Sequence, residues 1–175
     1  MPAMTRRYCP MCRREVETPR DALASLRAFP ASFQRVIASL SPREVNVTPR
    51  AGEWTARELA AHMADCEVAV GWRLRMMAAQ QRPPLTPFDQ DAWAAALNYR
   101  GHDLKNTLDL FASLRRANCD LLKAGQPGIW DRAGVHQEHG EITVRQMMDH
   151  FAHHDLHHLN KLRDKIRRIR AGERA

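Results

Sequence analysis

The chain has 175 residues, of which 44% are hydrophobic and 27% are charged. This balance is typical of one globular domain with its own core. No apolar run reaches the roughly 18 residues that a membrane-spanning helix needs, and the basic first twenty residues lack the apolar segment of an export signal. We therefore expect a cytoplasmic protein with no membrane partner.

The net charge of +7 is concentrated at the two ends of the chain. Residues 1–20 carry a net +3 and residues 161–175 a net +5, so the segment between them is almost neutral. Basic ends can contact nucleic acid, and a nucleic-acid-associated module that uses them is one alternative function. Lys and Arg at the end of a helix also complement its dipole, and we favour that interpretation over a nucleic-acid partner.

Four cysteines without an export signal do not predict a disulfide framework. Cys9 and Cys12 form a C-x-x-C motif, whereas Cys66 and Cys119 are single residues within helical patterns. The motif resembles half of a zinc ribbon, but a ribbon needs a second C-x-x-C, and none follows. The pair could complete a zinc site with another chain, act in redox chemistry, or have no role. We expect residues 1–19 to form a flexible basic arm.

Apolar residues spaced three or four apart, together with capping residues, predict an all-α protein built as a four-helix bundle. Thr55 and Glu58 form a capping box at the start of the second helix, and Pro30 should start, break or kink the first. A short extra helix is expected at residues 88–99, between helices two and three. The long helices are expected at residues 21–40, 55–80, 103–123 and 143–170, within a bundle domain at 20–170 that is followed by a tail at 171–175.

Five of the nine histidines fall within nine residues of the last predicted helix. On a helical wheel of roughly 100° per residue, His154 and His158 border the apolar stripe of that helix. His153 and His157 face away from the stripe, and His150 is intermediate. We therefore expect His154 and His158 to point toward the interior, whereas His150 could contact the ligands of a site or join it.

Two imidazoles make a weak metal site, because Zn²⁺ or Ni²⁺ binds tightly only with three or four ligands. Helical bundles supply such ligands from facing helices. His62 is the only histidine in the first half of the chain and lies beside the apolar stripe of the second helix. His136 and His139, in a predicted loop at residues 130–140, could add a fourth ligand, act as acid or base, or be solvated.

Residues 52–67 read GEWTARELAAHMADCE, and residues 143–158 read TVRQMMDHFAHHDLHH. Together they resemble the DinB/YfiT-like family, and the resemblance extends from about residue 20 to about residue 165. It implies a helical bundle that binds a divalent metal through His62, His154 and His158, and imidazole ligands favour zinc or nickel. It also implies a homodimer. The family often has a glutamine in the turn after the last ligand, where this chain has Asn160 and Lys161.

Three neutral ligands would leave a metal its full charge and an open coordination position, as in catalytic sites. Such a metal can generate hydroxide from water or bind a thiolate. The resemblance implies metal-dependent hydrolases, or S-transferases with a small thiol cosubstrate. We expect an enzyme of one of these types acting on a small molecule, with a general base that the sequence does not identify. The alternative is a metal-binding or stress-response protein without turnover.

The sequence also predicts the surroundings of four further residues. Trp54 should be a packing anchor at the entry of the second helix. Glu67 on that helix could pair with Arg75, eight residues further along, or stay solvated. Asp155 and His157, both polar residues of the last helix, should lie at the surface.

Overall fold

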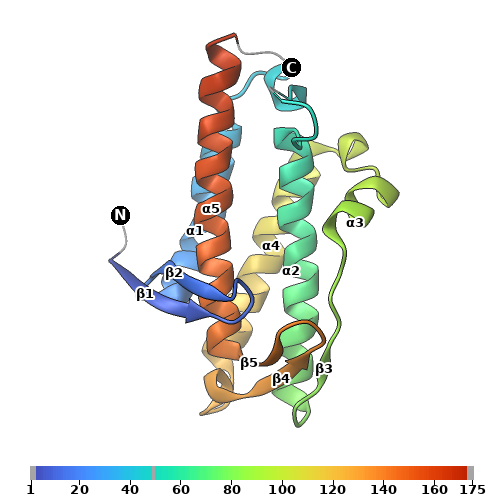
Figure 1. Ribbon diagram of the computed structural model, residues 1–175. Coiled ribbons are helices and arrows are strands. Elements are labelled where there is room, and N and C mark those ends of the chain that lie inside the picture. The colour runs from blue at the N-terminus through green and yellow to red at the C-terminus, as the bar shows by residue number, and fades with distance from the viewer. Residues whose placement is uncertain (1–2, 49, 173–175) are drawn as a thin grey trace.

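Four long helices run along a common axis and make up most of the structure, a computed structural model that describes residues 3–48 and 50–172 (Figure 1). They confirm the predicted four-helix bundle. A short helix, α3 (Gln90–Ala96), lies between the second and third long helices, as expected. The long helices are α1 (Ala22–Ile37), α2 (Ala56–Ala79), α4 (Leu104–Ala124) and α5 (Val144–Arg170), and short 3₁₀ turns cover Glu44–Asn46, Tyr99–Gly101 and Ile129–Asp131.

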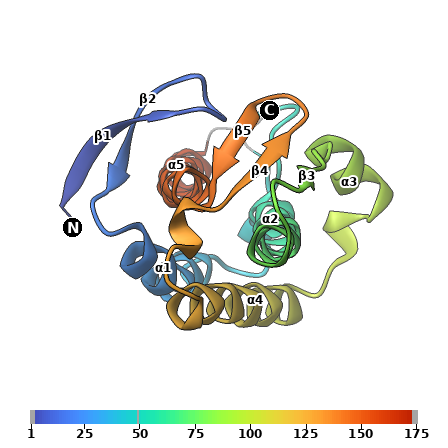
Figure 2. The same cartoon turned by 90° about the horizontal axis from the view of Figure 1, so that it is seen from below.

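Viewed along the bundle, α1 lies between α4 and α5, and α2 packs against α4 (Figure 2). Helices α2 and α5 therefore face each other on the remaining side of the bundle. The three histidines singled out from the sequence are divided between these two helices. Within the described residues, no helix combines the length and the apolar character needed to cross a membrane.

Capping interactions fix where the two histidine-bearing helices begin. Thr55 accepts from the backbone N–H of Glu58 (3.1 Å), and the Glu58 carboxylate accepts from the N–H of Thr55 (2.7 Å). Thr143 and Gln146 form the same reciprocal arrangement at the start of α5. Each box satisfies backbone donors that the first helical turn leaves free. Pro30 neither starts nor ends a helix, because α1 continues through it.

Strands occupy two segments that were expected to have no secondary structure. Instead of a flexible arm at residues 1–19, β1 (Met4–Cys9) and β2 (Arg14–Pro19) form an antiparallel hairpin. Part of the predicted 130–140 loop is β4 (Ala133–His136), which pairs in parallel with β3 (Pro84–Leu85) and antiparallel with β5 (Gly140–Thr143). The end of the predicted tail, residues 173–175, lies outside the described residues.

The β1–β2 hairpin was missed because its stability depends on tertiary contacts. A two-stranded hairpin is marginal in water by itself. Here it lies across α5, where Arg7 pairs with Asp149 (2.7 Å) and Thr18 donates to the Asp149 carbonyl oxygen (3.1 Å). Val16 on the same strand as Thr18 is buried against the bundle. None of these contacts is visible in the periodicity of residues 1–19.

The apolar core consists of two clusters that meet at a buried polar layer. One cluster contains the first turns of α1 and α5 and the second half of α2; the other contains the opposite halves of these helices. The residues that separate them are charged or polar although each is almost fully buried. They are Glu67 on α2, Arg115 and Asn118 on α4, and Asp155 on α5.

Candidate metal centre

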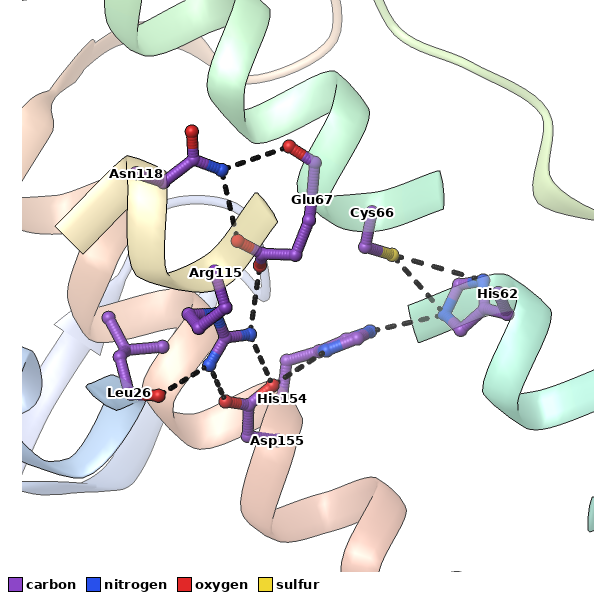
Figure 3. Close-up of polar contacts among 8 residues, drawn as sticks. All are labelled: Leu26, His62, Cys66, Glu67, Arg115, Asn118, His154 and Asp155. Atoms are coloured by element: carbon purple, nitrogen blue, oxygen red, sulfur yellow. Dashed lines mark hydrogen bonds and ion pairs between the residues drawn. The ribbon is translucent and has the colours of Figure 1, made fainter. Parts of the chain in front are cut away.

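His62, His154 and His158 converge between α2 and α5. His62 is 1% exposed, and its Nε2 lies 3.3 Å from Nε2 of His154 (Figure 3). The ring of His158 lies 4.3 Å from that of His154 and 5.1 Å from that of His62, centroid to centroid. One ring nitrogen of each histidine lies within 4.8 Å of the other two. The structure thus brings together the three residues singled out from the sequence.

The spacing of these nitrogens suits a shared metal ion. Zinc–nitrogen bonds of about 2.0–2.1 Å in a tetrahedral site place neighbouring ligand nitrogens about 3.3–3.4 Å apart. The His62–His154 separation of 3.3 Å falls on that value. Because the two Nε2 atoms face each other, a small ion between them could bind both without a change of rotamer.

The other histidines of α5 point elsewhere. His157 is exposed. The Nδ1 of His153 lies 2.9 Å from the carbonyl oxygen of Glu17 on the β1–β2 hairpin. His150 turns toward Cys9 and Cys12, a contact that sequence reasoning did not foresee. His136 and His139 form a separate group with Glu138 on the β4–β5 hairpin.

Burial keeps the three converging imidazoles neutral. It lowers the pKa of His62 to about 4. Burial, together with the neighbouring His154 and His62, lowers the pKa of His158 to about 2. The pKa of His154 also lies well below its ordinary value, again chiefly because of burial. At neutral pH all three rings therefore have a free lone pair, which is the form that binds metals.

Two side chains of the first half of the chain pack directly on His62. The ring of Trp54 lies 4.9 Å from that of His62, centroid to centroid, in agreement with its expected role as a packing anchor. Cys66 Sγ lies 3.5 Å from Nε2 of His62 (Figure 3). Burial raises the pKa of the Cys66 thiol, so this sulfur is protonated at neutral pH. The four-residue spacing of His62 and Cys66 on α2 already places the two side chains on one face of the helix.

A buried ionic cluster lies directly behind His154. Arg115 forms two hydrogen bonds with Asp155 (2.6 and 3.1 Å) and an ion pair with Glu67 (2.8 Å). Asn118 donates to the Glu67 carboxylate (3.0 Å), and Arg115 also donates to the carbonyl oxygen of Leu26 (3.0 Å) (Figure 3). Every donor and acceptor in such a low-dielectric region needs a partner, and this cluster provides them across all four long helices.

Two predictions about this cluster were wrong. Asp155 was expected at the surface but is 2% exposed. On the helical wheel Asp155 lies about 140° from His150, within the apolar arc. The prediction relied on its charge, although its position on the helix indicated burial. Glu67 pairs with Arg115 of α4 rather than with an arginine of its own helix. Arg115 itself was overlooked, although it follows the core residue Phe111 by four positions.

The orientation of His154 also fits a metal ligand. Its Nδ1 is buried and lacks a hydrogen-bond partner among the described residues. The nearest carboxylate oxygen, Oδ1 of Asp155, lies 3.9 Å away, which is beyond direct hydrogen-bonding distance. Metal-bound histidines usually donate their other ring N–H to a carboxylate or water. A small ring movement or one water molecule would complete that arrangement here.

A pocket of about 710 Å³ reaches His158 from the surface. Its wall is formed by the segment before α2, the start of α3 and the second half of α5. Lys165 pairs with Glu53 (3.5 Å) and donates to the Trp54 carbonyl oxygen, which ties the segment before α2 to α5. Cationic side chains outnumber acidic ones in the lining. They are Arg50, Lys161, Lys165, Arg167 and Arg168, against Glu53, Asp91 and Asp164.

A four-helix bundle in which facing helices present three neutral histidines at the end of a pocket defines a recognisable class of metal-site scaffold. Residues 25–162 match the DinB superfamily. Because this match covers most of the chain, the protein belongs to that superfamily, as the resemblance of its motifs indicated.

Similar proteins agree with this assignment. A proposed metal-dependent hydrolase of Oceanobacillus iheyensis is 27% identical over 75% of this chain and 76% of its own length. The proposed metal-dependent hydrolase YfiT of Bacillus subtilis is 23% identical over 82% of each chain. The solved structure of YfiT, described as having an unusual four-helix bundle topology, superposes with a TM-score of 0.79 over 85% of each chain at 21% identity. This confirms the expected YfiT-like fold.

Proposed function

We propose that the protein is a metal-dependent hydrolase that holds one divalent ion, zinc or nickel, on His62, His154 and His158. The observation that carries this proposal is the convergence of three neutral imidazoles from α2 and α5 at a separation that suits a tetrahedral ion. The names of the relatives, which describe them as proposed metal-dependent hydrolases, support the same class.

The residues around the site have separate roles in this proposal. A divalent ion bound there would supply Lewis acidity and lower the pKa of water toward neutrality. Asp155, held by Arg115, would orient the ring of His154. The ring of Trp54 packs beside that of His62 and would limit the access of water to it. The pocket at His158 is large enough for a small-molecule substrate, and its excess of cations favours an anionic one.

A second candidate is a thiol-dependent S-transferase of the same metal site. Among the described residues, the three-histidine group contains no carboxylate, so the ligands would leave the charge of a divalent ion uncompensated. A thiolate would be a favourable fourth ligand for such an ion. Lys161, exposed at the pocket and without an ion-pair partner among the described residues, could bind a carboxylate of a small thiol cosubstrate.

Two activity panels should separate these candidates. Protein loaded with zinc or nickel is incubated with ester, amide and phosphoester substrates, and separately with electrophiles plus small thiols. We expect turnover on one panel that a chelator abolishes and added metal restores, because the bound ion supplies the Lewis acidity. His62→Ala should reduce turnover to the rate of the uncatalysed reaction, and His157→Ala should leave it unchanged.

Each remaining outcome has a defined meaning. Turnover that persists in chelated protein or in His62→Ala would show that the three histidines are not the catalytic centre. Stoichiometric metal without turnover on either panel would favour the non-catalytic metal-binding protein over both enzymes.

A further inference from the structure

The turn between β1 and β2 places two cysteines against α5. Figures 1 and 2 show the hairpin crossing α5, with this turn beside the β4–β5 hairpin. Cys9 Sγ lies 3.3 Å from Nδ1 of His150, and Cys12 Sγ lies 3.5 Å from the same nitrogen. One ligand atom from each of the three residues lies within 4.8 Å of the other two. Cys9 is buried and Cys12 half-buried, and both are free thiols.

These distances match those between ligands of one zinc ion. Zinc–sulfur bonds of about 2.3 Å and zinc–nitrogen bonds of about 2.0–2.1 Å at a tetrahedral angle separate sulfur and nitrogen by about 3.5–3.6 Å. The backbone N–H of Cys12 also points at Sγ of Cys9 (3.3 Å). A hydrogen bond of this kind stabilises negative charge on the sulfur, which a metal-bound thiolate requires.

We propose that Cys9, Cys12 and His150 form a second metal site, which binds zinc and is distinct from the three-histidine centre. The second C-x-x-C that a zinc ribbon would need is replaced by one histidine from a helix nearly the whole chain away. Two soft thiolates and one imidazole select zinc over magnesium or calcium. On binding, both thiols lose their protons to solvent while the imidazole binds in its neutral form.

The cysteine turn contacts the β4–β5 turn. Arg13, next to Cys12, donates to the carbonyl oxygen of Glu138 in that turn (2.6 Å). This contact connects the cysteine turn to the strand pair that carries His136 and His139. A water molecule or a side chain of this neighbouring turn would complete a four-coordinate site.

The position of this site gives it a structural role. A two-stranded hairpin is marginally stable by itself, and the free energy of zinc binding would add directly to its stability. His150 precedes His154 by one helical turn, and their ring centroids lie 6.1 Å apart. A zinc ion on the cysteines would therefore fix the hairpin to α5 directly beside the proposed catalytic centre, and would hold the ring of His150 away from it.

Metal analysis of the full chain, purified under reducing conditions and supplied with zinc, tests this proposal. Wild-type protein should bind about two equivalents of zinc, one at the three-histidine centre and one at the cysteine site. Cys9→Ser and His150→Ala should each bind about one, because each removes a ligand of the hairpin site only. Cys119→Ala, which changes a buried cysteine elsewhere, should still bind about two.

Cobalt substitution shows which site is lost. Cobalt bound to thiolate gives intense near-ultraviolet charge-transfer absorption, whereas cobalt bound by imidazoles alone does not. This absorption should be present in wild type and in His62→Ala, and absent in Cys9→Ser. Circular dichroism of each variant checks that the bundle is folded.

Three results would overturn the proposal. They are an unchanged zinc content in Cys9→Ser, a wild-type cobalt spectrum without thiolate absorption, and a Cys9–Cys12 disulfide that persists in the reduced, zinc-supplied protein. Failure of the three-histidine centre would be recognised separately. In that case the thiolate absorption would remain, and His62→Ala would bind as much metal as wild type.

Discussion

Protein in which His154 is replaced by alanine should lose about one equivalent of bound zinc or nickel per chain after dialysis. Three ligands are the minimum for a tight site of this type, and His154 Nε2 lies opposite Nε2 of His62. His62→Ala and His158→Ala should each cause the same loss. The measurement is elemental analysis of dialysed protein, combined with the cobalt spectrum that reports the cysteine site separately.

The matched controls for this prediction lie on the same helix. His157 is exposed, and His153 contacts the β1–β2 hairpin rather than the other histidines. His157→Ala and His153→Ala should therefore keep the full metal content. Equal losses from all five variants would mean that metal binds to the histidine-rich surface of α5 and not between the helices.

Replacement of Arg115 by alanine should lower the free energy of unfolding by about 3–5 kcal/mol, the cost of removing one partner from a buried ionic group. The substitution leaves the carboxylates of Glu67 and Asp155 buried without their cation. Burial already raises the pKa of Asp155, and Arg115 opposes this effect. In the variant the pKa should rise further, so that Asp155 becomes protonated and no longer orients His154 as a carboxylate.

Chemical denaturation of metal-free protein measures this effect without a contribution from metal binding. Arg116 is the matched control because it is the next residue of α4 and is exposed. Arg116→Ala should change the free energy of unfolding by no more than about 0.5 kcal/mol. A similar small change for Arg115→Ala would contradict the structural importance assigned to the cluster.

Local sequence signals were sufficient to predict the long helices and to predict which histidines of the last helix face the interior. The capping residues Thr55 and Thr143 mark the observed starts of α2 and α5. The phase of α5 then determines which histidines turn inward, because side chains four residues apart share a face. Both inferences depend only on residues within a single helix.

Contacts between distant segments were not accessible in this way. Arg115 is an ordinary charged residue until α4 is packed against α2 and α5, where it meets Glu67 and Asp155. His150 meets Cys9 only because the hairpin crosses α5. In both cases the sequence contained the chemically relevant residues, but their partners were set by tertiary packing.

Anomalous X-ray diffraction from crystals of the metal-loaded protein tests the three-histidine centre most directly. Data collected on either side of the absorption edge of the bound metal locate that metal without reference to activity. The account predicts a peak between α2 and α5, about 2.0–2.1 Å from ring nitrogens of His62, His154 and His158. Full metal content with no peak at these three residues, and a peak instead at His136 and His139 or on the outer face of α5, would contradict it.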